Sequence, residues 1–506
     1  MGRLRPNHPP EDREVSQPGR KNSADIPSTV SQACGLEVDQ FPADYDVADW
    51  ASAQATRSRG TNHSNRLAVF ALALPVLAAL LLAYLYATPM PLTDEWLFLR
   101  GAMRIKAANL ATLNGWETVV GSFVFRIYDH CVAVPFAVYL VVANLANFDS
   151  RALVGVTVVC FIVQVWLYRR FLLGSAWWTL PIAMLLFSPS HYAEFLWGFQ
   201  FTLALSVVLP TCGLIVAGQS LAQPAGPKPW RFFLGLVLIS LGAMSAAGGA
   251  FGFAACAFLL WLRPIGRRRR VIFTMVLFCA MLVFILGVSP QAPVRLHASC
   301  AKLLQALTML GACIWGSPVG LASFHIDYLS VTGGLILFAG AFALFRAAYL
   351  RKMHDITLSF AIAMFGLMTT CATVVEREYV GNWHLQYALP VVGGAYAMSY
   401  CVWRGDRSWY GRAPLAVLLV VLALLPVGYV RGFTQFGQGF NANAKQVEDY
   451  ARRISSEPNL RKPFPPTGGW DFDSEMAAFL IARGHPSISN PGSPSKNPFP
   501  PAEPPR

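Results

Sequence analysis

Two acidic residues stand side by side just beyond the first long apolar run of the sequence. Residues Leu67–Thr88 are almost purely hydrophobic, and the stretch PLTDEWLF, which contains Asp94 and Glu95, follows at residues 91–98. A carboxylate pair at a membrane surface, flanked by Trp and Phe at headgroup level, suits a base that acts on a lipid-bound substrate. Thr93 or Asp94 could instead cap a helix, with Glu95 complementing the helix dipole. The two interpretations are compatible, because a base held at a helix start is well oriented.

A second polar group, Arg126, Asp129 and His130, comes directly before the next apolar segment. An arginine, an aspartate and a histidine at a membrane entrance could bind a phosphate and orient a second substrate. They could equally be capping groups and side chains whose charged ends reach the interface.

A third group lies where Pro189 interrupts the apolar pattern. His191, Glu194 and Gln200 stand there among aromatic residues, within the stretch SPSHYAEFLWGFQ at residues 188–200. Polar groups at such a break more often line a cavity than face lipid. The alternative is an interfacial turn that belongs to an aromatic belt.

A fourth group combines Arg377, His384 and Tyr387 in one loop. The arginine could neutralise a phosphate leaving group, with the histidine and tyrosine as nearby hydrogen-bond donors. An ion pair between Arg377 and a neighbouring glutamate is the simpler alternative.

The elements that must position these side chains are predicted to be membrane helices. The chain has 506 residues, is 55% hydrophobic and only 13% charged, and has too few polar residues to cover a soluble globule of this size. Apolar stretches recur near the length that spans about 30 Å of hydrocarbon. We therefore expect an all-α, polytopic integral membrane protein with about 11–13 transmembrane helices, and with interfacial helices in its first external loop.

The charge distribution predicts an orientation in the membrane. Residues 1–66 are polar and proline-rich, do not have the pattern of a secretory signal, and carry arginines next to the first span. Most of the net charge of +13 lies in short loops such as Arg267–Arg270. The positive-inside rule accounts for this surplus, so we expect a cytoplasmic N-terminus and no nucleic-acid partner. We also expect an external C-terminal region, provided that Cys300–Trp315 is interfacial or re-entrant rather than a full crossing.

Four regions follow from this pattern. We expect a mostly disordered tail at 1–66, a transmembrane domain at 67–432 whose first external loop is 89–130, a small external helical segment at 433–485, and a disordered proline-rich tail at 486–506. The arginine-rich loops leave one problem. If both Arg169-Arg170 and the turn near Lys228 are cytoplasmic, one segment between Cys131 and Ser188 cannot be a full crossing.

Several classes of chemistry lose support. The ten cysteines lie mostly inside apolar helices without CxxC spacing, which favours neither a disulfide framework nor a metal cluster. We find no P-loop, GxSxG, HExxH or dinucleotide-binding pattern in a suitable context.

The order of these motifs resembles that of the membrane-embedded GT-C glycosyltransferases, which include protein mannosyltransferases, aminoarabinose transferases and bacterial sugar transferases of the Rgt type. In those families the first external loop carries Asp-Glu followed by an aromatic residue three positions on, as Asp94-Glu95 and Phe98 do here. His130 with Pro135 and Tyr139 is loosely similar to the start of the family's second span. The resemblance covers mainly residues 67–220.

The resemblance implies a bacterial inner-membrane enzyme that takes a sugar from a polyprenyl-phosphate donor. Asp94, or with less weight Glu95, would be the general base that deprotonates a hydroxyl of an envelope glycan, lipid or protein acceptor. The sugar would leave its lipid phosphate with inversion, and Arg377, ahead of Arg126 and His384, would meet that phosphate. Some relatives use a divalent metal at the acidic loop, for which Asp94, Glu95 and Glu194 could supply oxygen ligands; metal use stays open.

Two other functions are compatible with the sequence. A transporter or flippase for a lipid-linked saccharide would need charged groups at the bilayer midplane, whereas the notable charges here cluster at helix ends. A non-catalytic scaffold of an envelope-synthesis complex would tolerate neutralisation of Asp94 and Glu95.

Overall fold

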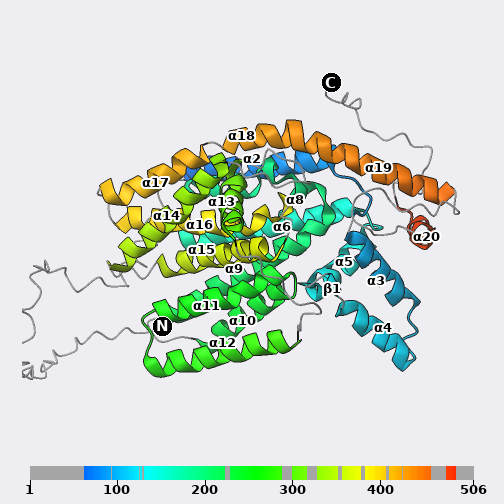
Figure 1. The fold of residues 1–506 in the computed structure, drawn as a ribbon, viewed down its shortest axis with the longest axis horizontal. Helices are drawn as coiled ribbons and strands as arrows, with labels where there is room; N and C mark the ends of the chain where they lie inside the picture. The colour runs from blue at the N-terminus through cyan, green and yellow to red at the C-terminus, as the bar shows by residue number, and fades with distance from the viewer. Residues whose placement is uncertain are drawn as a thin grey trace, which may run out of the picture. The chain divides into compact units, whose positions relative to one another are not determined.

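A computed structural model describes the chain between residues 62 and 485 (Figure 1). The described residues are 62–92, 94–124, 126–127, 130–222, 228–287, 299–315, 328–350, 356–377, 382–405, 409–423, 425–456 and 474–485. The expected tails at residues 1–61 and 486–506 lie outside them, as do Thr93 and Asp129. Residues Met1–Asn62 and His63–Arg506 form separate units, and the described elements beyond Asn62 belong to the second.

The described chain is helical apart from one short ladder, which confirms the all-α prediction. In chain order its α-helices are α2 (Asn62–Tyr86), α3 (Glu95–Ala107), α4 (Leu113–Phe123), α5 (Ala133–Leu145), α6 (Ser150–Leu167), α7 (Ala176–Leu186), α8 (Tyr192–Leu196), α9 (Phe201–Leu221), α10 (Pro229–Ala243), α11 (Phe251–Leu262), α12 (Arg267–Gly287), α13 (Cys300–Trp315), α14 (Tyr328–Leu350), α15 (Ile356–Glu376), α16 (Leu389–Gly405), α17 (Trp409–Leu422), α18 (Leu425–Arg431), α19 (Gly437–Ser456) and α20 (Ser474–Ala482). Tighter or wider turns join some of them: η1 (Tyr168–Leu173), η2 (Pro189–His191), η3 (Gly198–Gln200), η4 (Ala247–Ala250), η5 (Asn382–Tyr387) and η6 (Gly432–Phe436). Strands β1 (Arg126–Ile127) and β2 (His130–Cys131) pair antiparallel.

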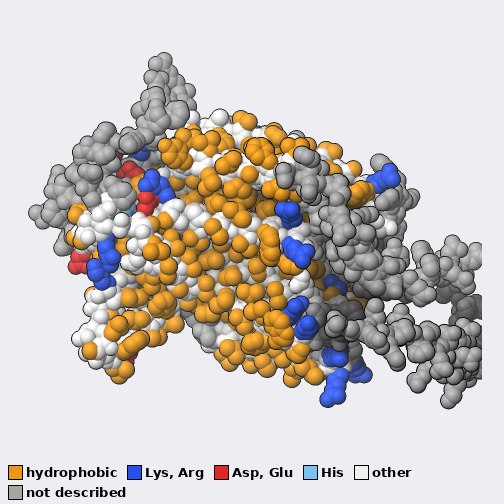
Figure 2. Space-filling model, turned by 180° about the vertical axis from the view of Figure 1, so that it is seen from behind, with side chains coloured by type: hydrophobic (Ala, Val, Ile, Leu, Met, Phe, Trp, Pro, Cys, Tyr) orange, Lys and Arg blue, Asp and Glu red, His pale blue; other side chains and the backbone are white. Residues whose placement is uncertain are grey.

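Six helical stretches of the described chain are long and apolar enough to cross a membrane, which supports the membrane assignment. They are Leu67–Tyr86, Ser150–Leu173, Gly198–Leu221, Arg267–Leu286, Ile356–Glu376 and Arg412–Gln446. The stretches in α2 and α12 are the least buried, with 22% and 11% of their apolar windows inside the protein. Figure 2 shows one face covered largely by apolar side chains, with lysine and arginine side chains in a row along one edge. A surface of this kind suits contact with lipid better than contact with water.

The residues that flank helix α5 on both sides lie near the first loop. Val132, just before α5, packs in the same buried cluster as Phe98 of the first loop. Ser150, just after α5, donates its backbone N–H to the Pro89 carbonyl over 2.8 Å. The chain therefore enters α5 and starts α6 close to the first loop.

The glycines between residues 242 and 252 serve close packing, as their small size predicts. A Cβ atom at Gly252 would lie 2.9 Å from Ile239 and 3.0 Å from Pro210, and side chains at Gly242 or Gly249 would overlap neighbouring atoms. The chain can therefore turn sharply from α10 through η4 into α11. This turn brings residues 245–251 to the end of the bundle.

The predicted C-terminal helical segment packs against the first loop. Met476, Ala477 and Leu480 of α20 are fully buried in one cluster with residues of α3. His485 donates to the Pro89 carbonyl over 3.1 Å, and Thr88 donates to the Glu448 carboxylate of α19. A segment too short for a core of its own thus completes the core beneath α3.

This docking predicts that alanine substitutions at two adjacent residues of α20 change the stability of the protein by different amounts. We expect Leu480→Ala to destabilise the protein by about 2–5 kcal/mol, because a fully buried leucine is removed from a packed cluster. Ile481→Ala is the matched control, since Ile481 is 44% exposed. Thermal unfolding of both variants in detergent tests this, and equal effects would contradict the docked position of α20.

Candidate functional site

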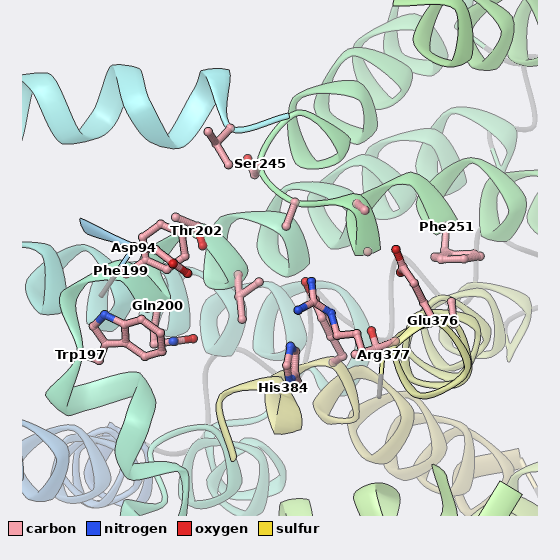
Figure 3. Close-up of a pocket in the computed structure, with 18 residues that line it drawn as sticks. Asp94, Trp197, Phe199, Gln200, Thr202, Ser245, Phe251, Glu376, Arg377 and His384 are labelled. Atoms are coloured by element: carbon pink, nitrogen blue, oxygen red, sulfur yellow. The ribbon is translucent and has the colours of Figure 1, made fainter. Parts of the chain in front are cut away.

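One cavity gathers five of the residues singled out in the sequence: Asp94, Gln200, Arg377, His384 and Tyr387 (Figure 3). It is partly open to solvent. Its lining consists of Asp94, Val132, Trp197, Phe199, Gln200, Thr202, Leu203, Ser245, Ala246, Ala247, Gly248, Phe251, Ala372, Thr373, Glu376, Arg377, His384 and Tyr387. These residues come from the first loop and the residue before α5, from η3 and the start of α9, from η4 with the residues before it and the start of α11, from the end of α15, and from η5.

Asp94 lies at the start of α3 and faces the cavity. It occupies the cap position, yet its side chain makes no capping hydrogen bond to the described first turn of the helix. Burial raises the pKa of its carboxyl from 3.8 to about 6, and the positive charge of Arg377 opposes part of that rise. The carboxylate is therefore mostly ionised at neutral pH and is available to the cavity, as a general base requires.

Glu95 points elsewhere, because adjacent helical residues project about 100° apart. It is fully buried and is not among the described residues that line the cavity. Its carboxylate accepts hydrogen bonds from the Ser150 hydroxyl at 2.7 and 3.0 Å and from the Phe199 backbone N–H at 2.9 Å. Burial raises the pKa of Glu95 to about 8, against the opposing effect of these hydrogen bonds.

The raised pKa of Glu95 predicts a pH-dependent stability. Its ordinary value is 4.5 and its folded value about 8, so its contribution to stability is present below pH 4.5 and is lost as the pH rises towards 8. Glutamine does not titrate. We expect Glu95→Gln to gain stability relative to the wild type by up to about 1.4 kcal/mol per pH unit across this window.

Thermal unfolding at pH 5, 7 and 8 measures this difference. Glu117→Gln is the control, because Glu117 lies exposed on α4 of the same loop. An offset between Glu95→Gln and the wild type that stays constant with pH would contradict a neutral, buried Glu95.

The turn at residues 197–200 forms the wall next to Asp94. The Trp197 indole donates to the Leu92 carbonyl over 3.2 Å, and the Trp197 and Phe199 rings stack with centroids 5.7 Å apart. Gln200 is buried, and its side-chain oxygen has no hydrogen-bond partner among the described groups. Gln200 thus offers the cavity an acceptor, beside the aromatic surface of Trp197 and Phe199.

The opposite wall carries charged and polar side chains, namely Arg377, Glu376 and His384. Arg377 follows the last residue of α15, and its guanidinium and His384 enter the cavity from the side opposite Asp94 and Trp197 (Figure 3). The backbone carbonyl of Arg377 accepts a hydrogen bond from the Lys302 ammonium. The His384 and Tyr387 rings stack with centroids 6.3 Å apart, and Gly248 leaves room for Tyr387, since a Cβ there would lie 2.9 Å from that ring.

His191 and Glu194 are buried but are not part of the described lining. His191 Nε2 lies 2.5 Å from the Cys313 carbonyl, and burial lowers the pKa of this histidine to about 4. Neither carboxyl oxygen of Glu194 has a hydrogen-bond partner among the described groups, and burial raises its pKa well above the usual range. Burial therefore favours the uncharged form of both side chains.

The group at residues 126–130 is placed through its backbone. Ile127 pairs with His130 in the ladder, and Val132, just after β2, lines the cavity. The side chains of Arg126 and His130, and the whole of Asp129, lie outside what the structure describes.

Several lining residues did not stand out as site candidates in the sequence. Trp197 and Phe199 were visible as part of an aromatic string. Ser245 and Phe251 stand in or beside the glycine-rich stretch that predicts helix packing, and this packing is what brings them to the cavity. No group of three or more His, Cys, Asp or Glu side chains in the described chain is placed to hold a metal ion.

Comparison of the chain with protein-family models, with curated proteins and with solved structures finds no significant match.

Proposed function

We propose that the protein is a glycosyltransferase of the GT-C type, which moves a sugar from a polyprenyl-phosphate donor to a hydroxyl of an envelope glycan, lipid or protein. The observation that carries the proposal is one cavity in which the Asp94 carboxylate faces Arg377 and His384. A base on one wall and a cation on the other are what transfer from a phosphate leaving group requires.

The chemistry uses both walls. Asp94 takes the proton of the acceptor hydroxyl while the hydroxyl oxygen bonds to the sugar's anomeric carbon. The bond from that carbon to the phosphate oxygen breaks, and the phosphate keeps the electron pair. Arg377 neutralises the charge that develops on the phosphate oxygen. The configuration at the anomeric carbon inverts, because Asp94 and Arg377 act from opposite sides of the cavity.

The proposed orientation places the cavity at the external face. Helices α6, α11 and α16 each begin beside the site: Ser150 bonds to Glu95, Phe251 lines the cavity, and α16 follows Tyr387. Their other ends carry or precede basic residues, namely Arg169-Arg170, Arg263 with Arg267–Arg270, and Arg404. If the basic ends are cytoplasmic, as the positive-inside rule requires, the cavity opens on the opposite side.

A transfer assay tests the proposal. Purified full-length protein in detergent receives radiolabelled polyprenyl-phosphate sugars and a membrane extract as acceptor. We expect label to move into the extract with at least one donor. Absence of transfer with every donor would refute the proposal and favour a transporter or a scaffold.

A further inference from the structure

We propose that Glu95 is a positioning residue: its carboxyl fastens the first loop to the turn at residues 197–200 and to the start of α6, and so fixes where Asp94 lies. This inference rests on the proposed function for its catalytic consequence. Its structural part stands on contacts alone.

The first argument is the direction of the Glu95 side chain. It points away from the cavity into a site with no solvent exposure, where the Ser150 hydroxyl and the Phe199 N–H donate to it. A residue so enclosed cannot reach a substrate in the cavity. It can, however, hold together two elements that are 104 and 55 residues away in the sequence.

The second argument is that neighbouring bonds join the same elements. Ser150 N–H donates to the Pro89 carbonyl over 2.8 Å, and the Trp197 indole donates to the Leu92 carbonyl over 3.2 Å. Pro89 and Leu92, which precede the acidic pair, are thus each bonded to one of these two elements. The Glu95 carboxyl contacts both elements, through Ser150 and Phe199.

The third argument is the glycine at position 198. A Cβ atom there would overlap the Ser150 hydroxyl and lie 3.0 Å from the nearer Glu95 oxygen. The turn can therefore come close enough for Phe199 N–H to reach Glu95 only because residue 198 has no side chain. Phe199 and its neighbours line the cavity beside Asp94, so this close approach sets the spacing between the wall and the base.

Glutamine and alanine at position 95 separate positioning from proton transfer. Glutamine keeps an oxygen for the Phe199 N–H and an amide that can donate to the Ser150 hydroxyl, but it cannot act as a base. Alanine removes both contacts. Hydrogen exchange of the Phe199 amide reports the contact directly, and the transfer rate reports its consequence.

The experiment compares Glu95→Ala, Glu95→Gln and Ser150→Ala in the full chain. We expect Glu95→Ala to speed exchange of peptides spanning residues 196–203 by at least about tenfold and to slow transfer by a similar factor. In Glu95→Gln the exchange rate and the transfer rate should both stay within about threefold of the wild type, and the pH profile of transfer should be unchanged. Ser150→Ala should give exchange and transfer rates between those of the wild type and those of Glu95→Ala.

Two results would overturn the inference. One is a Glu95→Gln variant that exchanges like the wild type yet transfers no sugar, which would make Glu95 a proton carrier. The other is an unchanged exchange rate in Glu95→Ala, which would mean that the Glu95 carboxyl does not stabilise the turn at residues 197–200. If the wild type transfers no sugar, the proposed function fails, while the exchange data still decide whether Glu95 fastens the loop.

Discussion

Replacing Asp94 with asparagine is expected to lower sugar transfer by about a hundredfold to ten-thousandfold, the range that a general base contributes. Asparagine has nearly the same shape and removes only the ability to accept the proton. The side chain makes no capping hydrogen bond to the described first turn of α3, so its replacement should leave that helix intact. Initial rates of transfer by purified protein, with thermal unfolding as a check on folding, measure the effect.

The pH dependence of transfer gives an independent reading of the same residue. The active form of Asp94 is the ionised one, and its pKa is about 6. The rate should therefore be nearly constant above pH 7 and should fall as the pH drops through 6. Glu117→Gln in the same loop is the control and should keep the wild-type rate, because Glu117 is exposed on α4. More than a tenth of the wild-type rate in Asp94→Asn would exclude it as the base.

The sequence was sufficient to place several of the polar residues that line the cavity at the ends of apolar runs. Asp94, Gln200, Arg377 and His384 each stand next to an apolar run, and helix ends on one side of a membrane come together when the helices pack. Apolar length and charge bias are the basis of the expected orientation. Both quantities can be read without a structure.

Which side chains point into the cavity could not be predicted from apolar length and charge bias. Asp94 and Glu95 are adjacent, and only the start of α3 determines which of them faces the cavity. His191 and Glu194 stand in the short helical turns η2 and α8, whose irregular geometry gives no period from which an outward or inward face could be deduced. Both turn into the protein interior, outside the described cavity lining.

Two features of the fold could not be predicted from the local sequence pattern, for a related reason. An apolar run such as α5 looks like a crossing, and its return to the first loop depends on contacts with Phe98 and Pro89 that are remote in sequence. The docking of α20 on α3 likewise depends on a partner almost 400 residues away, as the 396-residue separation of His485 and Pro89 illustrates. Local pattern cannot specify such pairings.

Replacing Arg377 with glutamine is expected to slow transfer by about a hundredfold to a thousandfold, the usual effect of removing a group that stabilises transition-state charge. It should also move the acidic limb of the pH profile. Arg377 lowers the pKa of Asp94, so without that charge the pKa rises and the loss of rate begins at a higher pH than in the wild type.

The paired change in rate and pH profile distinguishes a cation that acts in the cavity from one that only supports the fold. Arg377→Lys keeps the positive charge, so its transfer rate should fall at nearly the same acidic pH as that of the wild type. It loses the planar, bidentate contact that arginine makes with phosphate. Arg404→Gln, at the exposed end of α16 away from the lining, should change neither quantity. A slower Arg377→Gln variant whose acidic limb stays at the wild-type pH would show that Arg377 does not act on Asp94, and the two walls of the site would then have to be assigned separate roles.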